Sequence, residues 1–169
     1  SLVREAARLS PALALEVGRL AAGLTALGVG QGDRIAIYLP MIPEAVAVML
    51  AATRIGAIFV PFFSGYGAEA VAQRIADCEA TLLVCANGFF RRGRQVPMLD
   101  DARRAAAASP TLRHLLVIDR FGEASSDGGG DGSHFEEVDY RALLSTAQPD
   151  TALRDYPPDQ TLMLVYTSG

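Results

Sequence analysis

The sequence contains no lysine, and all fifteen of its basic residues are arginine. Lysine chemistry, from Schiff-base formation to phosphate binding by an ammonium group, therefore cannot come from this chain. Tryptophan is also absent, and aromatic residues make up only 7% of the sequence. The hydrophobic residues, which make up 50%, are mainly Ala, Val, Leu and Ile. Such a composition is typical of helices packed on a buried sheet.

The charge balance is mildly acidic, with 15 basic and 19 acidic residues and a net charge of −4. This balance argues against a general nucleic-acid surface or an anionic-membrane surface. No apolar run reaches the roughly 18 residues that a membrane span needs. No charged start followed by an apolar signal segment is present either. We therefore predict a cytoplasmic protein with no membrane span and no nucleic-acid partner.

Cysteine and histidine are scarce, with two residues of each. Cys78 and Cys85 lie among apolar neighbours in a predicted helix and a predicted strand. They are expected to be buried free thiols rather than a disulfide or a nucleophile. His114 and His134 have no Ser, Cys or paired carboxylate in a catalytic arrangement, so no catalytic role is predicted for them.

Short apolar runs alternate with amphipathic segments along the chain. The predicted strands lie near residues 34–39, 57–62, 81–86, 114–118 and 161–166. The predicted helices cover residues 11–27, 43–55, 68–79, 98–109 and 138–147. Strand–helix–strand alternation at this spacing predicts one α/β domain over residues 1–169, with a mostly parallel sheet and helices on both faces.

A stretch rich in Gly, Ser and Asp, "GEASSDGGGDGS", interrupts the alternation at residues 122–133. It cannot bury enough apolar surface to order itself, so a flexible loop is predicted over about residues 122–135. A phosphate-binding loop is the alternative, but no helix with an apolar face opens directly behind it. The glycine fingerprints of the common dinucleotide fold and of P-loop NTPases are also missing.

The last predicted strand ends in Thr167, Ser168 and Gly169. Open α/β sheets bind ligands at the carboxyl ends of their strands, so these residues are candidates for the start of an anion-binding loop. A plain exit from a strand into a turn is the alternative.

Three arginines, Arg91, Arg92 and Arg94, fall within four positions of "FFRRGRQVP", just after the predicted strand at 81–86. Guanidinium groups suit phosphate recognition. A solvated basic turn is the alternative.

These pieces together resemble a known family. The segment "GLTALGVGQGDRIAIYLPMIPEAVAVMLAATRIGAIFVPF" is similar to the N-terminal domain of the adenylate-forming acyl-CoA synthetases, and most similar to their acetyl-CoA-synthetase-like branch. "EAVAQRIADCEATLLVCANGFFRRGRQVPM" continues the resemblance, and "LVYTSG" looks like the opening of that family's P-loop. The resemblance covers nearly the whole chain, and it rests on the order and spacing of the motifs.

The resemblance implies a three-layer α/β/α fold that forms part of the large N-terminal domain of this superfamily. It also implies an incomplete domain that ends inside the P-loop. Enzymes of this family join a carboxylic acid to ATP with Mg²⁺, release pyrophosphate and pass the acyl group to CoA. By match, Thr167, Ser168 and Gly169 begin the ATP phosphate loop.

The same resemblance assigns the CoA nucleotide to Phe63, Ser64 and Gly65 together with Arg91 and Arg94. Ser64 stands where the family has a glycine. The catalytic and metal-binding residues of the family lie downstream, so none is expected within this chain, and the isolated chain is expected to be inactive. Its expected partners are a small carboxylic acid, ATP, CoA and the remainder of the polypeptide. A carrier-protein-loading adenylation domain and a non-catalytic binding module are the alternatives.

Overall fold

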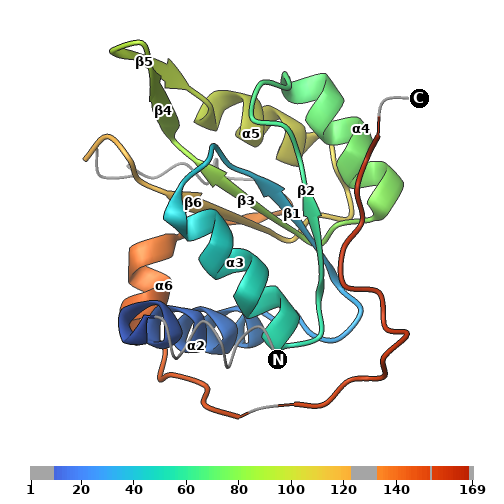
Figure 1. Ribbon diagram of the computed structural model, residues 1–169. Helices are drawn as coiled ribbons and strands as arrows, with labels where there is room; N and C mark the ends of the chain where they lie inside the picture. Colours follow the sequence, from blue (N-terminus) through green and yellow to red (C-terminus); the bar gives the residue numbers. More distant parts are fainter. Residues whose placement is uncertain (1–9, 123–132, 153, 168–169) are drawn as a thin grey trace.

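The computed structural model describes residues 10–122, 133–152 and 154–167 as a three-layer α/β/α fold (Figure 1). The central sheet is parallel throughout, in the order β2–β1–β3–β6–β7. Its strands are β1 (Arg34–Tyr38), β2 (Ile58–Pro61), β3 (Leu82–Ala86), β6 (His114–Ile118) and β7 (Glu136–Asp139). The predicted α/β fold with helices on both faces is confirmed.

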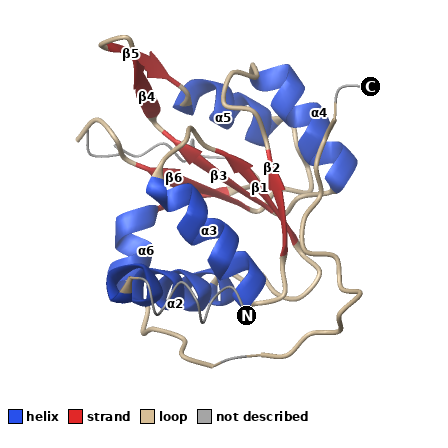
Figure 2. Cartoon of the chain, viewed as in Figure 1, coloured by secondary structure: helices blue, strands red, loops and turns tan. Residues whose placement is uncertain are grey.

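Two groups of helices cover the sheet (Figure 2). One face is covered by α2 (Pro11–Ala26), α3 (Pro43–Arg54) and α6 (Tyr140–Thr146), and the other by α4 (Ala68–Cys78) and α5 (Leu99–Ala107). The strands alternate between the two cores: Ile35 and Ile37 pack towards α2 and α3, whereas Ala36 and Tyr38 pack towards α4 and α5. A strand buried on both faces reads as a continuous apolar run, which explains the sequence signal.

Local chemistry sets the helix ends. Ser10 caps α2 by accepting a hydrogen bond from the amide of Leu13 (3.3 Å), and Pro11 occupies the first turn. This arrangement satisfies a free helix N–H, and the missing N–H of proline costs nothing there. After α3 the chain turns at Gly56, whose φ is +74° and where an added Cβ would lie 2.6 Å from the ring of Tyr156. Both the conformation and the space require glycine.

The prediction of a strand at residues 161–166 is wrong. Among the described residues, this segment forms only one parallel bridge, between Phe59 and Met163. In this bridge the Phe59 amide donates to the Leu162 carbonyl (3.2 Å), and the Leu164 amide donates to the Phe59 carbonyl (3.1 Å). The segment lies outside β2, and no other described strand pairs with its outer edge. The side chains of residues 162–165 are therefore 37–56% exposed instead of buried.

Two features of the sheet region were missed. Strand β7 pairs in parallel with β6, although its sequence "EEVD" is too acidic to suggest a strand. The arginine-rich turn is an antiparallel hairpin, formed by β4 (Gly88–Arg91) and β5 (Arg94–Pro97). Most of the predicted flexible loop lies outside the described residues. Its predicted end at residue 135 is too late, because Phe135 is buried in the core on the α4 and α5 face of the sheet.

Both cysteines are free and buried, as predicted. Burial raises the thiol pKa of each above its ordinary value. In the described parts of the chain, no helix is long and apolar enough to cross a bilayer.

Alkaline titration is expected to unfold the chain as its tyrosines ionise. Of the five tyrosines, four (Tyr38, Tyr140, Tyr156 and Tyr166) have a raised phenol pKa, with burial as the largest cause, and that of Tyr38 reaches about 12. A raised pKa favours the neutral phenol in the folded state. This stabilisation is complete below the unfolded pKa near 10 and is lost as the pH rises through the folded pKa. Phenolate absorbance should rise late and together with loss of circular dichroism. Ionisation of all tyrosines near pH 10 in a folded chain would contradict this account.

Candidate functional site

The strand order reverses between β1 and β3. The connection through α3 places β2 on one side of β1, and the connection through α4 returns past β1 to place β3 on its other side. The helices α3 and α5, which follow β1 and β3, therefore lie on opposite faces of the sheet. In open α/β sheets, ligands bind outside the carboxyl ends of the strands at such a reversal. The β4–β5 hairpin begins at this edge, directly after β3, and projects beyond it (Figure 1).

The hairpin brings two of the predicted site residues together. Its two-residue turn consists of Arg92 and Gly93, with φ values of +52° and +75°, and Arg91 stands directly opposite Arg94. Both φ values are positive, as in the type I′ turn that fits the twist of a hairpin. Side chains directly opposite on two antiparallel strands share a face, with Cβ atoms about 4.5–5.5 Å apart.

The paired guanidiniums have no acidic partner among the residues that the structure describes. Both Arg91 and Arg94 are exposed, and within the described residues neither makes an ion pair or a side-chain hydrogen bond. Like charges directly opposite each other destabilise a hairpin. A phosphate bound between them would relieve this repulsion and accept charge-assisted hydrogen bonds from both.

The segment Phe63, Ser64 and Gly65 forms the turn that follows β2 at the same edge of the sheet. The ring of Phe63 is 66% exposed, and it lies so close to Gly65 that a Cβ there would collide with it. The next residue, Tyr66, is anchored because its carbonyl accepts a hydrogen bond from the buried Tyr38 hydroxyl (2.6 Å). No hydrogen bond or ion pair between described residues joins this turn to the arginine hairpin.

Thr167 also reaches this edge. Met163 lies beside Phe59 in parallel, so the chain runs alongside β2 and carries Thr167 past the end of that strand. Ser168 and Gly169 lie outside the described residues. Tyr166 fixes the approach, because its hydroxyl donates to the Asp77 carboxylate (2.6 Å).

Arg74 contacts both the segment that follows β2 and the segment that leads to Thr167. The guanidinium of Arg74 lies 4.1 Å from the centre of the Tyr66 ring and 5.5 Å from that of the Tyr166 ring. A guanidinium over an aromatic face is attracted by the negative charge of the π system. Arg74 on α4 therefore lies between the segment after β2 and the segment that leads to Thr167.

Asn87 and Asp119, at the carboxyl ends of β3 and β6, were not predicted as site residues from the sequence. The Asn87 amide group donates to the Asp119 carboxylate at 2.7 Å. Their signal was present, because each is the first polar residue after a buried apolar run, at the edge where ligands bind. Nearby, Arg120 and Glu44 form an ion pair at 3.6 Å.

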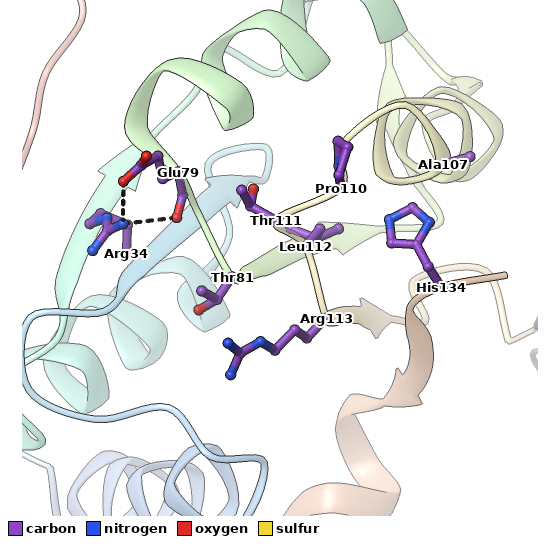
Figure 3. Close-up of a pocket in the computed structure, with 9 residues that line it drawn as sticks. All are labelled: Arg34, Glu79, Thr81, Ala107, Pro110, Thr111, Leu112, Arg113 and His134. Carbon is purple, nitrogen blue, oxygen red and sulfur yellow. Dashed lines mark hydrogen bonds and ion pairs between the residues drawn. The ribbon is translucent and has the colours of Figure 1, made fainter.

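A hollow of about 610 Å³ lies at the opposite edge, where β1, β3 and β6 begin (Figure 3). Several of its polar side chains are engaged by the protein itself, whereas the Thr81 hydroxyl is buried with no partner among the described residues. Arg34 donates to the carbonyls of Gly32, Cys78 and Glu79 and to the Glu79 carboxylate. Thr111 is bonded to a backbone carbonyl in the same way. In the described residues, no group of three or more acidic, His or Cys side chains could hold a metal ion.

Comparison with known proteins decides the family. The family of AMP-binding enzymes matches residues 11–169. The chain belongs to this family. It is 36% identical over 154 residues to an acetyl-coenzyme A synthetase of Methanothrix thermoacetophila, a match that covers 90% of this chain and 22% of that protein. It is 39% identical over 159 residues to an acetyl-coenzyme A synthetase of Mycobacterium tuberculosis, covering 93% and 24%.

The fold of this AMP-binding chain agrees with a solved structure. Acetoacetyl-CoA synthetase from Streptomyces lividans superposes with a TM-score of 0.81 at 30% sequence identity. The match covers 93% of this chain and 23% of that one. The fold is therefore that of the adenylate-forming superfamily, and the chain spans less than a quarter of the length of these relatives.

Proposed function

We propose that this chain is the N-terminal part of an AMP-forming acyl-CoA synthetase. Such an enzyme converts a carboxylic acid, ATP and CoA into acyl-CoA, AMP and pyrophosphate. The observation that carries the proposal is the exposed, directly opposed pair Arg91 and Arg94, beyond the carboxyl ends of the strands in an AMP-binding chain. The acetyl-CoA and acetoacetyl-CoA synthetases among its relatives favour a small acid as substrate.

The two arginines would bind a phosphate of the CoA nucleotide. Each guanidinium offers planar N–H donors that match phosphate oxygens, and two of them from one face can hold a single anion. Phe63 exposes an aromatic face beside the turn at Ser64 and Gly65. This face suits stacking against the adenine ring of CoA. These side chains would thus hold CoA while the acyl group is transferred to its thiol.

On the ATP side, Thr167, Ser168 and Gly169 would begin the phosphate loop. The hydroxyl groups can contact phosphate oxygens, and glycine lets the backbone approach them closely. A lysine contact to ATP cannot come from this chain, which has none. The resemblance to the family assigns the Mg²⁺ ion that accompanies ATP to residues downstream of this chain.

The remainder of the polypeptide is the proposed partner of the exposed apolar segment at residues 162–165. An open sheet edge with exposed apolar side chains is a site where a further strand can pair. Less than a quarter of the length of the relatives is represented here. A cytoplasmic location is part of the same proposal, and the two free thiols fit a reducing compartment.

The isolated 169-residue chain is expected to show no synthetase activity, whereas the full-length protein should be active. In a pyrophosphate-exchange assay, the full-length protein should incorporate labelled pyrophosphate into ATP when acetate or acetoacetate is added. The chain alone should give only background, because most donors that would hold the triphosphate are missing. Exchange by the chain above a no-protein control would show that the active site has been misplaced. If the full-length protein gave no pyrophosphate exchange with any of the carboxylic acids tested, the proposed function would be wrong.

A further inference from the structure

Asn87 uses nearly all of its hydrogen-bonding groups at the base of the arginine hairpin. Its backbone amide donates to the Ile118 carbonyl (3.0 Å), and its carbonyl accepts from the Met98 amide (3.0 Å). Its side-chain NH₂ donates to the Asp119 carboxylate (2.7 Å), and its side-chain oxygen accepts from the Arg120 amide (2.8 Å). Because Asn87 precedes β4 and Met98 follows β5, these bonds join both ends of the hairpin to the end of β6.

Asp119 completes the arrangement from the other side. One of its carboxylate oxygens accepts from Asn87 and also from the amides of Phe121 and Gly122, both at 3.0 Å. The loop held in this way places the Phe121 ring against Phe90 of the hairpin, with centroids 5.4 Å apart. The same ring lies where a side chain at Gly88 would have to go.

The direction in which the hairpin projects from the main sheet depends on the bonds made by Asn87 and Asp119. Strands β4 and β5 form a two-stranded sheet that is separate from the main sheet in the described residues. A two-stranded hairpin is marginally stable by itself. Phe89 and Phe90 pack at its sides, but the backbone leaves the main sheet at Asn87. The bonds made at Asn87 therefore determine where the tip points.

We propose that Asn87 and Asp119 are positioning residues for Arg91 and Arg94. The bond between their side chains fixes the angle at which the hairpin leaves the sheet, and this angle places the two guanidiniums over the ligand edge. The inference rests on the proposed binding of CoA by these arginines. It adds that CoA affinity depends on two residues that need not touch CoA themselves.

The first test is independent of CoA. In the 169-residue chain, Asn87→Asp would place two carboxylates against each other and break the bond. Amide hydrogen exchange should then become at least about tenfold faster over residues 88–97, with exchange in β1 unchanged. Unchanged exchange over residues 88–97 in N87D would overturn the positioning role.

The second test uses the full-length enzyme. N87D should raise the KM for CoA about fivefold or more and leave the KM for ATP in pyrophosphate exchange within about twofold. Equal loss of both half-reactions would show a merely structural role and contradict the inference. If Arg91→Ala raises the KM for CoA but N87D does not, the positioning role alone fails. If Arg91→Ala also has no effect, the proposed CoA site fails as well.

Discussion

Replacing Arg91 or Arg94 with Ala is expected to raise the KM for CoA about tenfold or more in the full-length enzyme. Each charge-assisted contact to phosphate is worth about 1.5–3 kcal/mol, and tenfold corresponds to about 1.4 kcal/mol. The two side chains face each other across the hairpin and are exposed, so their removal disturbs little else. In the proposed reaction, formation of the adenylate would precede CoA binding, so it should be nearly unchanged.

The measurement is a pair of assays on each variant, pyrophosphate exchange and CoA-dependent thioester formation. Arg92→Ala is the matched control, because it removes the same charge from the turn and leaves the opposed pair intact. It should change the KM for CoA by less than about twofold, since only screened long-range attraction is lost. A KM for CoA that stays within about twofold for both Arg91→Ala and Arg94→Ala would refute the CoA-phosphate assignment.

Arg103→Met is expected to lower the free energy of unfolding of the chain by about 2–3 kcal/mol. Arg103 on α5 makes a two-bond ion pair with Glu137 of β7, at 2.9 and 2.8 Å. The Glu137 side chain is only 8% exposed, so removing its partner leaves a carboxylate that water can barely reach. Urea unfolding followed by circular dichroism measures the loss.

The neighbouring arginine provides the control. Arg104 pairs with Asp101, but its side chain is 72% exposed, and Arg104→Met should cost less than about 0.5 kcal/mol. The double variant Arg103→Met with Glu137→Leu should recover most of the loss, because no unpaired charge is then left. A cost for Arg103→Met as small as that for Arg104→Met would show that the ion pair does not hold β7 in place.

The sequence was most informative where strands are buried on both faces. The strands near residues 34–39, 57–62, 81–86 and 114–118 were predicted correctly, because full burial produces continuous apolar runs. The same rule failed at residues 161–166, where an equally apolar run lies exposed outside β2. An apolar run indicates that a segment favours burial. It does not indicate whether the element that would cover the segment is present in the described chain.

The opposite error occurred at β7. Two glutamates open this strand, and only a contact distant in sequence, from Arg103 to Glu137, explains how the second of them is accommodated. The hairpin was missed for a different reason. Its turn is Arg-Gly rather than the usual Asn-Gly or Asp-Gly, so the positive φ of Arg92 could not be read from the residue type.

The candidate site was predictable in part. Arg91 and Arg94 were identified as an arginine cluster, but their arrangement as an opposed pair required the register of the hairpin. The positions of Phe63, Ser64 and Gly65 came from family resemblance, and their roles in CoA binding stay predictions. Asn87 and Asp119 lie 32 residues apart, and only the adjacency of β3 and β6 brings them together.

The most direct test of the proposed synthetase is the product that the full-length protein forms from ATP, acetate or acetoacetate, and CoA. We predict acyl-CoA and AMP in equal amounts, with formation of acyl-CoA strictly dependent on CoA. A carrier-protein-loading enzyme would instead transfer the acyl group to a carrier thiol and make no acyl-CoA, and a non-catalytic module would form neither product. Either of these results, or ADP in place of AMP, would contradict the account.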